Sequence, residues 1–248
     1  GYPDARLRMG YCYEYGIGVE KDLQKAVDLY RELSDQGFAQ AQCSLGFCYE
    51  NGIGVEPSAE HAFELYLQAA EQGDAPAQCN LGYFYNNGIG TEKDASAAIQ
   101  WLSAAARQRY PRAQLILGEL YEMGDGLPQD TPKALRLYQL AAKAGYSPAQ
   151  YKLGLMYYHG VGITKNEALA VEWFEKAAQQ EYPEAQFFLG YCYENGTGVT
   201  RDAAQAVGFY RLAAEQEYPT AQYVLAYCYE EGYLTERGVQ QAFALYKR

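Results

Sequence analysis

The residues of this sequence that could perform chemistry are six cysteines, two histidines and several pairs of carboxylates. His61 and His159 lie far apart, and neither stands in a His/Cys cluster with the spacing of metal ligands. A catalytic Cys–His pair needs a base within hydrogen-bond reach of the thiol, and no spacing here indicates one. Pairs such as Glu119 with Glu122 are typical of a solvated helix face in an acidic protein. We therefore expect no catalytic residues, no metal site and no cofactor.

Six G-x-G segments superficially resemble phosphate-binding loops, the first two being Gly16 with Gly18 and Gly52 with Gly54. None continues as G-K-[ST] or as G-x-x-G, and each lies between two predicted helices rather than after a strand. We interpret these glycines as helix ends, because glycine readily adopts the left-handed conformation that closes a helix.

The sequence repeats itself with a fixed step of 36 residues. A period of this length indicates a solenoid, in which each repeat packs mainly against its neighbours. We predict a single domain over residues 1–248, with repeats that start near residues 1, 37, 73, 109, 145, 181 and 217 and with the last repeat truncated. The step is set by seven anchor alanines: Ala5, Ala41, Ala77, Ala113, Ala149, Ala185 and Ala221.

Each repeat predicts two helices when its positions are numbered 1 to 36 from Gly1. Positions 3 to 15 form the first helix, with apolar residues at positions 5, 9, 12 and 13 in helical spacing. Position 10 is glycine in six copies, which indicates close approach of a partner helix. Positions 23 to 36 form the second helix. Its N-caps are Asp22, Ser58, Asp94, Asp130, Asn166 and Asp202.

The cysteines occupy two positions of the first helix. Position 12 holds Cys12, Cys48, Cys192 and Cys228, and position 7 holds Cys43 and Cys79. Other copies have hydrophobic residues at both positions, which favours small buried thiols, reduced and in a cytoplasmic setting. Disulfides between Cys12 and Cys43 and between Cys48 and Cys79 are the alternative.

The recurring A-x-x-x-L-G-x-x-Y-x-x-G-x-G-V-x-x-D-x-x-K-A pattern resembles the Sel-1-like repeat (SLR) family, which is related to the tetratricopeptide repeat. The resemblance covers essentially the whole chain in seven copies. It implies an all-α fold, a right-handed α/α superhelix (solenoid) whose first helices line the concave face. It also implies scaffold or adaptor roles in protein complexes.

The variable face of the first helix carries the best functional signal. If Met9 and Tyr13 point into the core, positions 4, 7, 8, 11, 14 and 15 point elsewhere, and by the tetratricopeptide analogy they line the groove. Rings and amides suit an extended peptide. Packing of first helix on first helix is the alternative for positions 7 and 11. The candidate binding residues are Tyr11, Phe47, Asn51, Tyr83, Asn87, Tyr151, His159, Tyr191, Asn195 and Tyr227.

The net charge of −11 argues against a nucleic-acid partner and against an anionic membrane surface. No apolar run approaches the length of a spanning helix, so we expect no membrane insertion. The first residue is Gly at a repeat boundary, which suggests a fragment of a longer chain.

We therefore predict a non-catalytic scaffold or adaptor that binds a peptide or helix of a partner protein in its concave groove. A regulatory or self-assembling arm of a larger, possibly enzyme-containing, protein is the alternative. We favour a monomer.

Overall fold

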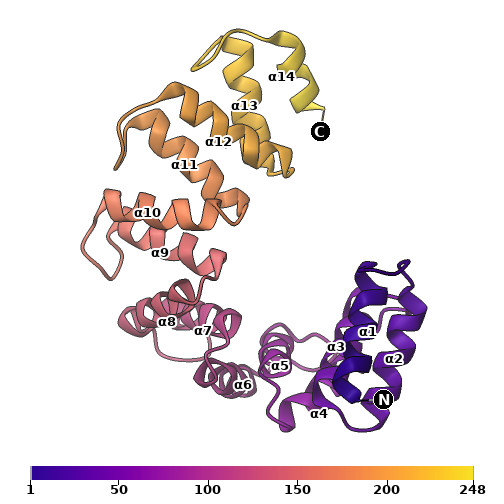
Figure 1. Ribbon diagram of the computed structural model, residues 1–248. Coiled ribbons are helices and arrows are strands. Elements are labelled where there is room, and N and C mark those ends of the chain that lie inside the picture. Colours follow the sequence, from indigo (N-terminus) through magenta and orange to yellow (C-terminus); the bar gives the residue numbers. More distant parts are fainter. Residues whose placement is uncertain (1, 248) are drawn as a thin grey trace. The chain divides into compact units, whose positions relative to one another are not determined.

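The computed structural model describes residues 2–247 and folds them into fourteen α-helices without strands (Figure 1). This confirms the predicted all-α repeat fold. The first helices of the seven repeats are α1 (Pro3–Tyr15), α3 (Ala39–Asn51), α5 (Ala75–Asn87), α7 (Pro111–Met123), α9 (Ser147–His159), α11 (Pro183–Asn195) and α13 (Pro219–Glu231). The second helices are α2 (Leu23–Asp35), α4 (Ala59–Glu71), α6 (Ala95–Arg107), α8 (Thr131–Lys143), α10 (Glu167–Ala178), α12 (Ala203–Glu215) and α14 (Val239–Tyr246).

The chain forms two compact units. Unit 1 runs from Gly1 to Gln129 and contains α1 to α7, and unit 2 runs from Asp130 to Arg248 and contains α8 to α14. Within each unit every helix packs against the helix before it and the helix after it. The single domain expected from the repeat period stays a prediction.

Capping residues set the helix boundaries close to where the sequence predicts them. The six predicted N-caps all accept a hydrogen bond from a backbone N–H in the first turn of the second helix, as Asp22 does from Lys25. Every first helix ends at a glycine in the left-handed conformation, such as Gly52 with φ 67°. The first glycine of each G-x-G segment therefore terminates a first helix.

The second glycine of the G-x-G segment allows close contact between repeats in five of the six segments. A Cβ at Gly90 would lie 2.3 Å from the carbonyl oxygen of Ala59, at the start of the preceding second helix. Gly18, in the first repeat, has no atom within 4 Å of the corresponding point.

The glycine inside the first helix lets an aromatic ring of the second helix lie against its backbone. A Cβ at Gly46 would lie 2.9 Å from the Tyr66 ring, and one at Gly154 would lie 2.5 Å from the Phe174 ring. Both distances are shorter than side chains tolerate, so the predicted close approach of the partner helix is confirmed. The cost of glycine in a helix is offset by burial of a large ring.

The core lies between the helix pairs and continues from repeat to repeat within each unit. Position 9 is buried at every leucine, from Leu45 to Leu225, because the second helix of the preceding repeat covers it. The prediction that Met9 also points into the core is wrong, since Met9 is 49% exposed. Among the described residues, Met9 lies on the first helix, and the second helix that covers position 9 in the later repeats has no counterpart before it in residues 2–247.

Buried glutamines join the two helices of a repeat. Gln42, at position 6, accepts a 2.7 Å hydrogen bond from Gln72 Nε2 at position 36, and Gln78 accepts one of 2.9 Å from Gln108. Repeats five and six contain the same pair. These bonds satisfy polar groups that would otherwise be costly to bury.

All six cysteines are free thiols, so neither alternative disulfide is present. Cys48, Cys79, Cys192 and Cys228 are buried. Burial raises the pKa of Cys48, Cys79 and Cys192 to about 12, which keeps these thiols protonated at neutral pH.

Candidate functional site

The exposed side of the first helices, which we call the first-helix face, consists of positions 4, 8, 11 and 15. Position 11 carries an exposed ring in five repeats, although position 12 beside it is buried in all repeats after the first. The helix is thus anchored on one side and presents an aromatic ring on the other. The exposed fractions are 46% for Tyr11, 42% for Phe47, 36% for Tyr83, 39% for Tyr191 and 48% for Tyr227.

The asparagines at position 15 are exposed and are held by their own helices. Asn51 Nδ2 donates to the carbonyl oxygen of Phe47 at 2.9 Å, and Asn87 and Asn195 make the same bond to the residue four positions earlier. Each bond satisfies a carbonyl near the helix end and fixes the amide plane. The amide oxygen and the second N–H hydrogen remain for an external partner.

The last two candidate residues are His159, at position 15, and Tyr151, at position 7 beside the first-helix face. His159 is exposed at the end of α9, with its ring 4.8 Å from that of Tyr158. Tyr151, at position 7, is half-buried, and its ring centroid lies 5.6 Å from those of Phe188 and Tyr182. Much of Tyr151 therefore packs between repeats, as the alternative for position 7 describes.

Position 14 differs from its prediction, because it points onto the partner helix. Glu14 is only 6% exposed and accepts a 2.8 Å hydrogen bond from the Tyr30 hydroxyl. Tyr66 donates to Glu50 at 2.5 Å, and repeats six and seven have the same bond. Burial, and secondarily the bond to glutamate, raises the pKa of Tyr30 and Tyr66 well above the ordinary value for tyrosine.

The sequence contains a signal for this bond that the periodicity analysis missed. The five repeats with Tyr at position 30 are the five with Glu at position 14. Where position 30 has no hydroxyl, position 14 is not acidic: Leu102 accompanies Asn86, and Phe174 accompanies Tyr158. The two positions vary together, as expected where the buried hydroxyl group of a tyrosine requires a hydrogen-bond partner.

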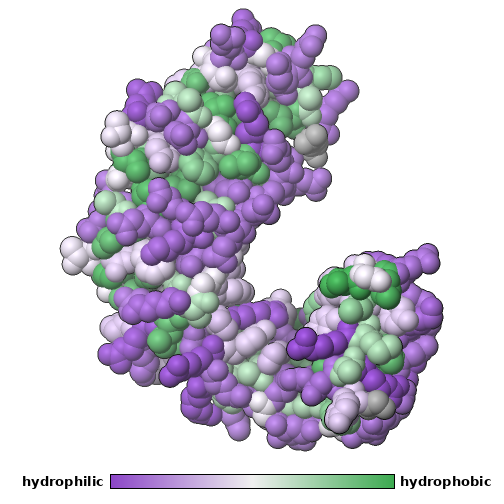
Figure 2. Space-filling model, in the orientation of Figure 1, coloured by the Kyte–Doolittle hydropathy of each residue, from purple (hydrophilic) through white to green (hydrophobic). Residues whose placement is uncertain are grey.

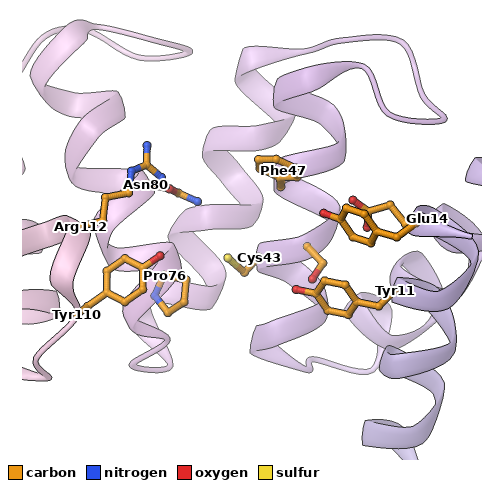
Figure 3. A pocket seen from close by; sticks show the side chains of 10 residues that line it. Tyr11, Glu14, Cys43, Phe47, Pro76, Asn80, Tyr110 and Arg112 are labelled. Atoms are coloured by element: carbon orange, nitrogen blue, oxygen red, sulfur yellow. Dashed lines mark hydrogen bonds between the residues drawn. The ribbon is translucent and has the colours of Figure 1, made fainter. Parts of the chain in front are cut away.

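A pocket of about 250 Å³ lies on the first-helix face of unit 1. Its lining comes from α1, α3 and α5 and from the start of α7, and Figure 3 shows Tyr11 and Glu14 on one side with Asn80 and Arg112 on the other. Arg112 Nη1 donates to Asn80 Oδ1 at 2.8 Å, and its guanidinium carbon lies 5.8 Å from the Tyr83 ring centroid. The pocket therefore combines aromatic surface with groups of both charges.

In unit 2 the face between α9 and α11 is aromatic. The ring centroids of Tyr158, Phe188 and Tyr191 are separated by 6.2, 6.3 and 6.5 Å, so each ring touches the other two. On the side of each unit that Figure 2 draws, hydrophobic residues are interspersed among polar ones.

The described residues contain no group of three or more potential His, Cys, Asp or Glu metal ligands. Between residues 2 and 247, no helix has the length and apolar character needed to cross a membrane.

The repeat geometry is matched by a family model along almost the entire chain. The Sel1 repeat model matches residues 3–38, 39–74, 75–110, 111–146, 147–182, 183–218 and 219–248. The chain belongs to the Sel1 repeat family. Proteins of this family are generally protein-interaction scaffolds without catalytic activity.

Solved structures of other Sel1 repeat proteins resemble this chain. A Sel1 repeat protein from Oxalobacter formigenes is 33% identical with a TM-score of 0.83, over 98% of this chain and 95% of that one. A protective antigen of uropathogenic Escherichia coli is 34% identical with a TM-score of 0.78, over 100% of this chain. The match spans 53% of that protein, so this chain corresponds to about half its length.

A more distant structure shares the fold alone. The immunity protein Pa5087 from Pseudomonas aeruginosa is 22% identical with a TM-score of 0.61, over 86% of this chain and 81% of that one. No curated protein sequence matches the chain.

Proposed function

We propose that the first-helix face of this Sel1 repeat protein binds an extended segment of a partner protein. The observation that carries the proposal is the exposed ring at position 11 in five repeats. A tyrosine or phenylalanine on the surface leaves apolar area in contact with water, and a repeated row of such rings is typical of a binding surface. The residues assigned to binding are Tyr11, Phe47, Asn51, Tyr83, Asn87, Tyr151, His159, Tyr191, Asn195 and Tyr227.

The polar groups beside the rings support an extended segment over a helix. Asn51 and Asn87 in unit 1 occupy the same repeat position, as Asn195 does in unit 2, so within each unit the amide groups accompany the exposed rings of position 11. A chain without internal hydrogen bonds has backbone N–H and C=O groups that can pair with such amides. Because each amide is already held by its own helix, little side-chain freedom is lost on binding.

The proposal is tested with phage-displayed random peptides selected on the folded protein. The affinity of the best selected peptide is then measured by fluorescence anisotropy for the wild type, Tyr83→Ala and Tyr191→Ala. We expect one of these substitutions to weaken binding about tenfold or more, since an aromatic contact at the centre of an interface contributes about 1.4 kcal/mol or more.

Matched controls separate binding from surface hydrophobicity. Phe38→Ala in unit 1 and Leu212→Ala in unit 2 remove side chains of similar exposure, 38% and 46%, that lie outside the first-helix face. Both controls should retain the wild-type affinity. Failure to select any peptide, or equal affinity for folded Tyr83→Ala, Tyr191→Ala and wild type, would overturn the proposal.

A further inference from the structure

Arg112, in the first turn of α7, is half-buried and has no carboxylate partner among residues 2–247. Its contacts are the amide oxygen of Asn80 at 2.8 Å and the ring of Tyr83. A guanidinium group has five N–H donors, and neither contact supplies a negative charge. Arg112 therefore has no ion-pair partner among the described residues.

The other arginines show that this is unusual. Arg6 is also half-buried, and both of its Nη atoms bond to the carboxylate of Glu32. The remaining arginines between residues 2 and 247 are exposed, so water solvates them. Removing a guanidinium group from water is costly unless an anion compensates it. Of the two half-buried arginines among residues 2–247, Arg112 is the one without a carboxylate partner.

The position of Arg112 allows an anion to reach it from outside. The side chain lines the unit 1 pocket, next to Asn80 and Tyr110 (Figure 3). Because the Asn80 oxygen accepts from Arg112, the Asn80 amide hydrogens remain available to a second acceptor. A carboxylate placed here would receive hydrogen bonds from both side chains, and an arginine can bind it with two parallel bonds.

Glu14 lies on the opposite side of the same pocket and is already bonded to the Tyr30 hydroxyl (Figure 3). It disfavours a second carboxylate at that side. An acidic residue of a bound segment would thus lie at the Arg112 side, with its neighbours along the chain against Phe47 and Pro76. The opposite charges of Arg112 and Glu14 therefore favour one orientation of a bound segment in the pocket.

We propose that Arg112 binds the side-chain carboxylate of an acidic residue within an extended segment of a partner protein that occupies the unit 1 pocket. This inference rests on the proposed function, because it names the chemistry of the segment. The recognised group is an Asp or Glu side chain.

The test compares peptides selected by phage display on the wild type, Arg112→Gln, Arg112→Lys and Arg107→Gln. Arg107→Gln is the matched control, because Arg107 is an exposed arginine of the same unit at the end of α6. On the wild type and on Arg107→Gln, we expect one aligned position to be strongly enriched in Asp and Glu. The enrichment should persist on Arg112→Lys, which retains the charge, and disappear on Arg112→Gln.

A synthetic peptide from the wild-type selection then tests the pair directly. Replacing its acidic residue with the amide should weaken binding to the wild type about tenfold and leave binding to Arg112→Gln nearly unchanged. Circular dichroism checks that each variant is folded, and Arg112→Lys keeps the test valid if Arg112→Gln is unstable.

The outcomes distinguish this inference from the proposed function. Selected peptides that depend on Phe47 but show no acidic position overturn the role of Arg112 alone. The same acidic enrichment on folded Arg112→Gln, or binding that requires a free peptide C-terminus, also overturns it. If no peptide is selected on the wild type, the proposed function and this inference fail together.

Discussion

Unit 1 and unit 2 repeat the same pair of helices, yet their first-helix faces differ in chemistry. In unit 1 the face holds a pocket with Arg112 and Glu14 on opposite sides. In unit 2 the face between α9 and α11 is covered by the rings of Tyr158, Phe188 and Tyr191. Position 4 carries Arg112 in α7 of unit 1 and Glu184 in α11 of unit 2, so the charge at this position has opposite signs in these two helices.

The difference begins at a residue that does not lie on the face. Tyr66 in unit 1 is buried, and its hydroxyl group donates a hydrogen bond to the carboxylate of Glu50 at position 14. Phe174 occupies the same position in unit 2 and has no hydroxyl, and position 14 is there the aromatic Tyr158. Repeat two thus pairs a buried hydroxyl group with a glutamate, and repeat five pairs a buried phenyl ring with Tyr158, whereas repeat six of unit 2 keeps the bond of repeat two through Tyr210 and Glu194.

The largest effect that we predict concerns the contact between a ring of the second helix and the glycine of the first helix, which both units contain. Gly154→Ala should lower the free energy of unfolding by about 2 kcal/mol, because its Cβ would lie 2.5 Å from the Phe174 ring. Gly46→Ala should cost less, about 1 kcal/mol, since the Tyr66 ring is 2.9 Å away. Urea unfolding followed by circular dichroism measures both changes.

Gly208→Ala is the control for helix propensity, because a Cβ added at this position of α12 would have no atom within 4 Å. It should raise the free energy of unfolding by up to about 1 kcal/mol. If Gly154→Ala were as stable as the wild type, the close contact between Gly154 and the Phe174 ring would not contribute to the stability of unit 2.

The next effect tests the coupling between positions 14 and 30. Tyr66→Phe should lower the free energy of unfolding by about 1 to 1.5 kcal/mol, because Glu50 loses its hydroxyl donor. Glu50→Gln should cost much less in the Tyr66→Phe background than in the wild type. A double-mutant cycle of the two substitutions measures this coupling.

The reverse exchange in unit 2 gives the matched comparison. Phe174→Tyr alone places a hydroxyl group in a buried site without a carboxylate and should destabilise the protein by about 1 kcal/mol. Adding Tyr158→Glu should recover most of that loss. Additive effects in both units would show that the shared variation of the two positions has no energetic basis.

The sequence predicts the positions of the helices and of their ends well, because these depend on residues close together in the chain. Six N-cap residues and seven left-handed glycines mark the helix ends directly, and Gly46 indicates the contact that Tyr66 makes. The pattern differs from the structure at Met9, because burial at position 9 depends on contact with the second helix of the preceding repeat and is not a property of one repeat alone; among residues 2–247, Met9 has no such contact.

The face is predicted less completely, since its contacts join residues whose types change from repeat to repeat. Variation among the copies is enough to identify position 11 as a candidate. It assigns Glu14 to the wrong side of the helix, because an acidic residue is ordinarily solvated and only comparison with position 30 shows its partner. The pairing of Arg112 with Asn80 joins two positions that hold other residues elsewhere, so no periodic signal exists for it.

The smallest effect that we predict concerns the response of the two units to alkaline pH. Burial, followed by the bond to Glu50, raises the pKa of the Tyr66 hydroxyl above its ordinary value of 10.0. The folded state therefore keeps the proton while the unfolded state loses it, so the contribution of Tyr66 to stability is present below pH 10 and declines as the pH rises above it. By pH 10.5 this decline amounts to about 0.8 kcal/mol for one tyrosine. Urea unfolding at pH 9 and pH 10.5 should thus show a smaller loss for Tyr66→Phe than for the wild type.

The corresponding site of unit 2 supplies the control, because Phe174 has no proton to lose. Phe174→Leu should leave the difference between pH 9 and pH 10.5 unchanged, whatever its effect on stability at neutral pH. Phe174→Tyr with Tyr158→Glu should instead make the loss larger, since it would create the same buried hydroxyl that unit 1 contains. If Tyr66→Phe and the wild type lost equal free energy over this range, Tyr66 would titrate alike in the folded and unfolded chain. The bond between Tyr66 and Glu50 would then not distinguish repeat two from repeat five in the response to alkaline pH.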